Sequence, residues 1–214
     1  VDITKLNDTT GNTVCGETNS FSPFAIFIKE KRSVNLFMHG SGANANPSNL
    51  FLNANAPTSP TEKYKDSVGI NFAKGNPWKE VGTWIAPADL TKGTLKELAD
   101  VHTWVGLKNS DDQGTRFDIR TELLRNGVVA ASGETYCVQG VTRNPSLAKE
   151  TIVSFASFAP VVFNGTVDKL SLRVLTRIGT DGEGKTCGGH SNANGLRIYF
   201  DAVSRSSKFR ATFQ

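Results

Sequence analysis

Short apolar runs of strand length, separated by turn residues, dominate this sequence and restrict it to an all-β fold. Val, Ile, Phe, Thr and Trp fill the runs, and these are residue types that strands favour. Many short strands without alternating helices predict an antiparallel β-sandwich, jelly-roll-like in its connections. The runs lie at 34–39, 81–86, 101–109, 117–125, 128–138, 151–158, 167–179, 196–204 and 208–213.

The finer pattern of these runs supports strands over helices. Apolar and Thr side chains alternate with other residues along 101–107, the period of a half-buried strand. The one helix-like window is 88–100, and Gly93 interrupts it. Asn126-Gly127 separates two runs and predicts a hairpin, because both residues readily adopt the positive φ of a type I′ turn.

The first residues of the chain form a separate unit. Residues 1–28 contain β-like runs around a polar turn, but they are too few to build their own core. The polar sequence "KEKRS" at 29–33 then indicates a linker or a strand end. We therefore predict an N-terminal β extension at 1–31 and a β-sandwich domain at 32–214.

The chain has three cysteines, so one thiol is left over whatever pairs form. In a secreted sandwich we predict a Cys137–Cys187 disulfide, because a strand end and a loop before a strand approach easily. Cys15 is then free, bonded to another chain, or separated from its natural partner. A cytosolic protein with reduced thiols is the alternative.

Two loops carry carboxylates that suit a calcium ion, the one cofactor that the sequence suggests. Neither matches the ligand spacing of an EF-hand, and Asp-Gly is also ordinary turn chemistry. Cys187 and His190 have zinc-ligand spacing, but no second Cys/His pair accompanies them. The calcium candidates are Asp111, Asp112 and Asp118 in the first loop, with Asp181 and Glu183 in the second.

The stretch "GHSNA" at 189–193 is close to the Gly-x-Ser-x-Gly elbow of serine hydrolases. Such an elbow needs a buried strand before the serine and a helix after it. Ser191 instead follows a polar, Gly-rich stretch and precedes a turn, and none of the three histidines comes after it. We therefore predict that the protein is not an enzyme and has no catalytic residues.

The charge distribution argues against a nucleic-acid partner, and the hydropathy argues against a transmembrane segment. The net charge is +4 and the pI near 9.0, but basic residues are scattered among acidic ones and the densest basic groups are short. This distribution argues against a nucleic-acid partner. No apolar run approaches the ~20 residues that span a bilayer, so we predict no transmembrane segment.

Two stretches resemble known modules. "NTVCGETNSFSPFAI" at 12–26 resembles the closing strands of β-sandwich modules in bacterial secreted or cell-surface multidomain proteins. The sequences at 63–84, 105–137 and 187–209 resemble a second extracellular β-rich module, which covers 34–214. The resemblance implies an extracellular or cell-surface location and brings no catalytic residue with it.

If residues 1–28 are an apolar strand pair without a sheet of their own, they can be buried by pairing with the sheet of another subunit. We therefore expect a structural protein, either a surface subunit or a filament subunit. It would form homo-oligomers or polymers through its N-terminal extension, with Cys15 as a candidate interchain bond. The same residues could instead fold back on their own domain. The expected assembly anchors are Phe21, Phe24, Ile26 and Ile28.

The alternative function is a carbohydrate-binding or adhesion module. Trp78 follows Pro in a turn and is the aromatic residue most expected to be exposed for stacking on a sugar. The irregular stretch 40–67 would supply a long surface loop for binding. Packing in the core explains most of the other aromatic residues equally well.

Overall fold

A computed structural model describes residues 4–8, 13–16 and 30–214, and the chain divides into two compact units, Val1–Glu30 and Lys31–Gln214. In the first unit, β1 (Thr4–Asp8) pairs antiparallel with β2 (Thr13–Gly16), which contains Cys15. The proposed anchors Phe21, Phe24, Ile26 and Ile28 lie outside the described residues.

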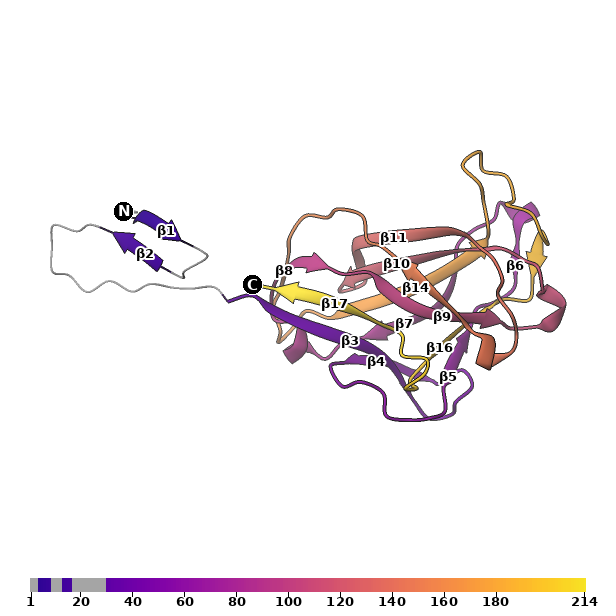
Figure 1. The fold of residues 1–214 in the computed structure, drawn as a ribbon, viewed down its shortest axis with the longest axis horizontal. Helices are drawn as coiled ribbons and strands as arrows, with labels where there is room; N and C mark the ends of the chain where they lie inside the picture. Colours follow the sequence, from indigo (N-terminus) through magenta and orange to yellow (C-terminus); the bar gives the residue numbers. More distant parts are fainter. Residues whose placement is uncertain (1–3, 9–12, 17–29) are drawn as a thin grey trace. The chain divides into compact units, whose positions relative to one another are not determined.

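The second unit is an antiparallel, jelly-roll-like β-sandwich, which confirms the predicted fold class (Figure 1). Its main strands form one hydrogen-bonded path of two layers, which the single parallel bridge between β4 and β7 joins. The first layer runs β11 (Val128–Val138), β10 (Phe117–Arg125), β14 (Leu170–Ile178), β7 (Lys79–Ile85). The second runs β4 (Asn49–Asn53), β3 (Arg32–Ser41), β17 (Lys208–Phe213), β9 (Val101–Leu107), β16 (Leu196–Phe200), β5 (Lys63–Asp66).

Smaller elements complete the sandwich. Three further strands extend the second layer: β12 (Lys149–Val153) on β9, β8 (Gly93–Leu98) on β17, and β13 (Val161–Phe163) on β8. A separate pair joins β6 (Ile70–Asn71) to β15 (Asn192–Ala193). The 3-10 helices are η1 (Phe72–Lys74), η2 (Ala88–Thr91), η3 (Ser110–Asp112) and η4 (Pro145–Leu147). Among the described residues, no helix is long and apolar enough to cross a membrane.

The core lies between the two layers. Alternate residues of β10 and β14 point inward, so Ile119 and Val174 are fully buried. Trp84 of β7 packs edge-to-face on Phe200 of β16, with ring centroids 5.3 Å apart. This contact joins strands of different layers, and such aromatic pairs contribute about 0.5–1.5 kcal/mol beyond the burial of their area.

The predicted Asn126-Gly127 hairpin is confirmed. Both residues have positive φ, 51° and 82°, and they connect β10 directly to β11. Asp168 holds this turn by accepting hydrogen bonds from the Asn164 N–H, Arg125 and Asn126. The Asn164 N–H, followed by Arg125, lowers the pKa of Asp168 to about 2. The carboxylate therefore stays charged, and the hairpin anchored, well into the acidic range.

The sandwich has two ends, which differ in the segments that form them. The hairpin end comprises the Asn126-Gly127 turn and the turn 164–168, which Asp168 joins. The loop end comprises the segments 69–79, 109–116 and 180–195. Strand β10 begins beside the loop end at Phe117 and finishes at the hairpin end with Arg125.

Candidate functional site

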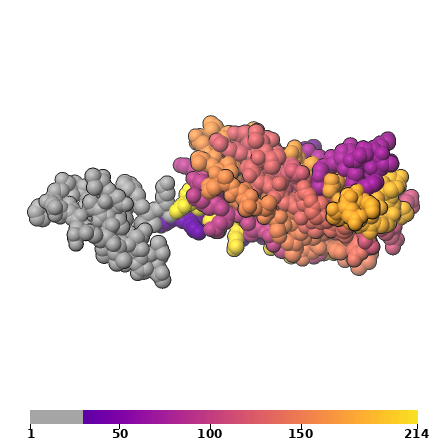
Figure 2. Space-filling view, turned by 90° about the horizontal axis from the view of Figure 1, so that it is seen from above, coloured from indigo at the N-terminus to yellow at the C-terminus, as the bar shows by residue number. Residues whose placement is uncertain are grey.

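The loop end contains a polar cleft of about 570 Å³. Figure 2 shows the purple segment around residue 70 beside the orange-yellow segment of 180–195. Three chain segments that are far apart in sequence thus supply its walls. Its side-chain amides come from Asn71, Asn192 and Asn194, its ammonium groups from Lys74 and Lys79, and its remaining polar groups from Asp111, Asp112 and His190.

The β6–β15 pair positions two of the amides. Asn71 lies opposite Asn192 in this short ladder, so both residues reach the same cleft. The Asn71 side-chain oxygen also accepts the Ala73 N–H at 2.9 Å and caps η1. Local turn chemistry and strand pairing therefore fix this wall together.

Asp112 joins this wall to the 109–116 segment. It is 5% exposed, and it accepts hydrogen bonds from the Asn194 N–H at 2.8 Å and from the Asn194 amide group at 3.2 Å. The exposed His190 donates from Nε2 to the Gln113 carbonyl at 3.0 Å. These contacts hold the 190–194 segment against the 109–116 segment, so the cleft has a defined shape.

A disulfide also anchors the 180–195 segment. Cys137 and Cys187 are bonded, as the sequence predicted, with Cα atoms 5.9 Å apart. The bond ties the end of β11 to the loop that carries His190. Arg116 donates to the Cys187 carbonyl at 2.6 Å and braces the same loop.

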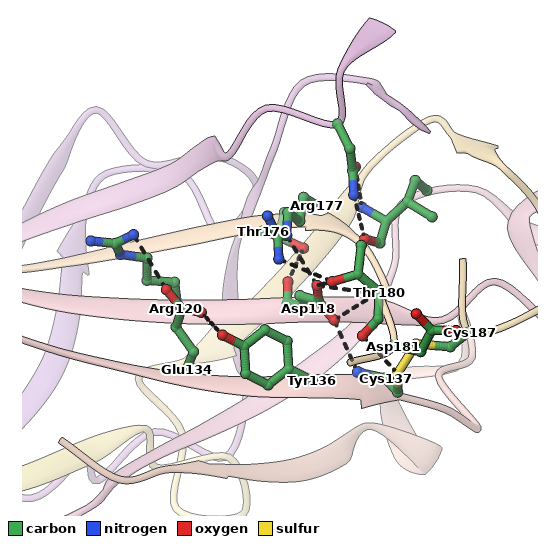
Figure 3. A network of polar contacts seen from close by, with 12 residues as sticks. Asp118, Arg120, Glu134, Tyr136, Cys137, Thr176, Arg177, Thr180, Asp181 and Cys187 are labelled. Atoms are coloured by element: carbon green, nitrogen blue, oxygen red, sulfur yellow. Dashed lines mark hydrogen bonds and ion pairs between the residues drawn. A yellow bond between two sulfur atoms is a disulfide. The ribbon is translucent and has the colours of Figure 1, made fainter. Parts of the chain in front are cut away.

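Asp118 supports the base of this loop (Figure 3). Its side chain is fully buried and accepts from the Thr180 hydroxyl at 2.6 Å, the Cys137 N–H at 3.0 Å and Arg177 Nε at 3.0 Å. The Thr180 N–H also donates to it at 3.1 Å. One carboxylate therefore joins β10, β14, the end of β11 and the start of the loop.

The carboxylates predicted for calcium do not gather at one point, although Asp111 and Asp112 both line the cleft. Asp118 supports the base of the loop, and Asp112 holds Asn194. Asp181 accepts from backbone N–H groups of its own turn, and Glu183 pairs with the exposed Lys185. In the described ranges, one group of three His, Cys, Asp or Glu side chains has its possible metal-ligand atoms close together, namely Asp118, Cys137 and Cys187. The two cysteines form a disulfide, so they are not available as thiolate ligands. The same bond excludes Cys187 from the zinc pair considered with His190.

Trp78 is not the open platform that the sequence suggested. The side chain is half-buried, and the Arg177 guanidinium lies over its ring at 4.4 Å from the centroid. Arg120, at 6.0 Å from the same ring, pairs with Glu134. Tyr136 donates to that carboxylate, and this hydrogen bond, with burial, raises the pKa of Tyr136. The face around Trp78 is therefore a network of paired charges.

One further sequence interpretation changes, and the interpretation of Ser191 does not. The 40–67 stretch is not one open loop, because it contains the strands β4 and β5. Ser191 precedes the short strand β15 and not a helix, so its segment does not form a nucleophile elbow.

Sequence reasoning missed most of the cleft. The sequence pointed to Asp111 and Asp112 as calcium ligands, and to His190 as a zinc ligand and as part of the "GHSNA" stretch, but it indicated none of them as part of a ligand-binding cleft. It did not select the lysines or the amides. The Asn- and Gly-rich sequences "GINFAKGN" and "SNANG" were the available signal, since such residues are frequent in functional loops.

Comparison with known proteins identifies the fold and nothing further. No family model matches the chain, and no curated protein matches it. A CocE/NonD family hydrolase from Staphylococcus aureus is similar over 94% of this chain and 39% of its own, with a TM-score of 0.50 and 12% identity. An aminopeptidase from a marine sediment archaeon, Thaumarchaeota archaeon, is similar over 97% and 40%, with a TM-score of 0.52 and 8% identity. The chain thus spans about two fifths of these structures.

Proposed function

We propose that this chain is a carbohydrate-binding module of an extracellular or cell-surface protein, and that its cleft at the loop end binds the sugar. The observation that carries the proposal is the convergence of amide, ammonium and carboxylate groups on one open cleft. A volume of about 570 Å³ is within the usual range for small-ligand sites. The proposal assigns binding, and no catalysis, to this chain.

The chemistry of the cleft suits a ligand rich in hydroxyl groups. A hydroxyl both donates and accepts, so it matches amides, which do the same, and ammonium groups, which only donate. Lys74 and Lys79 would donate to hydroxyl oxygens, while Asn192 offers both functions. Asp112 fixes Asn194 before the ligand arrives, which reduces the entropy lost on binding.

The disulfide supports the extracellular part of the proposal. Disulfides form and persist in oxidising compartments and are rare in the cytosol. The Cys137–Cys187 bond anchors a wall of the proposed site, so binding would depend on that environment.

Two substitutions in the cleft test sugar binding. Lys79→Ala and Asn192→Ala are each expected to weaken binding about 10-fold, because each removes a hydrogen bond worth about 1–2 kcal/mol. A panel of simple hexoses and oligosaccharides would be screened with the wild-type chain, and the dissociation constant measured by calorimetry. Lys185→Ala is the matched control, because this exposed lysine pairs with Glu183 away from the cleft. The proposal fails if no sugar binds, or if the cleft variants bind as tightly as the control.

The second candidate function is a surface or filament subunit that assembles through its N-terminal extension. It is favoured by the division of the chain, in which the β1–β2 hairpin belongs to a unit separate from the sandwich. An isolated two-stranded hairpin is at best marginally stable in water and gains by pairing with another sheet.

Assembly is tested with the full chain and the double variant Phe24→Asp/Ile26→Asp. The wild type is expected to form oligomers or filaments and the variant to remain monomeric, because charge prevents burial of the apolar segment. Light scattering and negative-stain microscopy measure mass and shape. A wild-type chain that stays monomeric at high concentration would overturn this candidate and leave the sugar-binding proposal intact.

A further inference from the structure

An apolar groove lies at the hairpin end, far from the cleft. It encloses about 410 Å³ and is lined by Val128, Val129 and Ala130 of β11 together with Val161 at the start of β13. Val128 is 72% exposed and Val129 42%. Exposed valines gathered in a hollow commonly mark a contact surface.

Strand edges border this groove on both sides. β11 pairs with β10, and its other side is met only farther along, where Gly133 bridges Phe155 and Ser132 accepts the Ala156 N–H. Within the described part of the chain, Val128 and Val129 pair only with β10, Ala130 lies at an irregularity in that ladder, and β13 pairs only with β8. Each strand therefore presents an open edge, and such edges readily accept a further strand.

The geometry points to strand insertion: residues 24–28 of a second copy of this chain occupy the groove between β11 and β13. This inference rests on the assembly candidate and names its acceptor. The donor sequence "FAIFI" has five consecutive apolar residues, with no charge and no proline. A strand that is covered on both faces has this continuous apolar pattern, and one that hydrogen-bonds at both edges needs every N–H group.

The turn beside the groove is fixed in place before any strand binds. Asp168 fixes the Asn126-Gly127 turn through Asn126 and through an ion pair with Arg125 at 2.8 Å, and both partners lie at the groove. Addition of a strand to a preformed edge gains main-chain hydrogen bonds, while the apolar side chains fill the hollow.

A second copy is the occupant because every chain carries both parts. The donor segment and the groove are different surfaces, so the contact is heterologous and each bound copy still offers its own groove or its own segment. Such contacts continue into a filament unless the rotation between copies closes a ring.

The test uses one variant for each half of the contact. Val129→Asp blocks the groove, Ile26→Asp blocks the donor segment, and Val203→Asp is the control, since Val203 is 66% exposed and does not line the groove. All three are full chains, with folding checked by circular dichroism and thermal unfolding. Sedimentation velocity is expected to show polymers for the wild type and the control, and at least about 100-fold weaker association for each blocked variant alone.

Mixing the two blocked variants gives the decisive result. The Val129→Asp chain keeps its donor segment and the Ile26→Asp chain keeps its groove, so an equimolar mixture is expected to form dimers that do not grow. If Ile26→Asp prevents assembly but Val129→Asp does not, the groove is not the acceptor, although the assembly function stands. If the wild type is monomeric, with the segment folded on its own chain or reserved for another protein, both are overturned.

Discussion

Replacement of Asp118 by Asn is expected to lower the free energy of unfolding by about 3 kcal/mol. The Asp118 side chain is fully buried, and the substitution removes the negative charge that Arg177 and Thr180 face. Breaking a buried ion pair costs about 3–5 kcal/mol, and the lower end applies because the Arg177 side chain retains 23% exposure. Urea unfolding followed by tryptophan fluorescence measures the change.

Glu183→Gln is the control for Asp118→Asn. Its ion pair with Lys185 is exposed at 74% and 75%, so the substitution should change the free energy of unfolding by less than about 0.5 kcal/mol. If Asp118→Asn costs less than about 1 kcal/mol, Asp118 does not hold the base of the loop. That result would reopen the question of what fixes the cleft wall.

The double variant Cys137→Ser/Cys187→Ser is expected to lose about 4 kcal/mol of stability. The disulfide joins residues separated by 50 positions, and the entropy of closing such a loop in the unfolded chain corresponds to about 4 kcal/mol. The variant should also bind any sugar ligand more weakly, because the 180–195 segment loses an anchor. Chemical unfolding and calorimetry measure the two effects.

A Cys15→Ser background provides the control for disulfide exchange. In this background, the wild-type pair treated with a reducing agent should match the double variant, since both lack the bond. Equal stability with and without the disulfide would show that the hydrogen bonds of Asp118 and Arg116 suffice to hold the loop.

The sequence was most informative where chain-local chemistry decides the structure. The Asn126-Gly127 turn follows from the conformations that these two residues adopt without strain. The 88–100 window shows the opposite case. Residues 88–91 form η2, but 93–98 form the strand β8, because pairing with β13 and β17 outweighs the helix-like pattern.

Long-range pairing decides the candidate site, and spacing along the chain does not reveal it. Asp118 has the residue type of a calcium ligand, but its partners Thr180 and Arg177 come from a strand and loop far along the chain. Asn71 and Asn192 meet only because β6 pairs with β15. Nothing in either local sequence indicates that partner.

The length of β10 has a consequence for how tightly an assembled form of the protein would bind a glycan surface. Its nine residues separate the two ends of the sandwich by about 30 Å, so a ligand at one end leaves the other unobstructed. A filament joined at the hairpin end would carry one sugar site per subunit. Against a polymeric glycan surface, weak individual sites in such an array would act together, and the effective affinity would rise with filament length without any new contact.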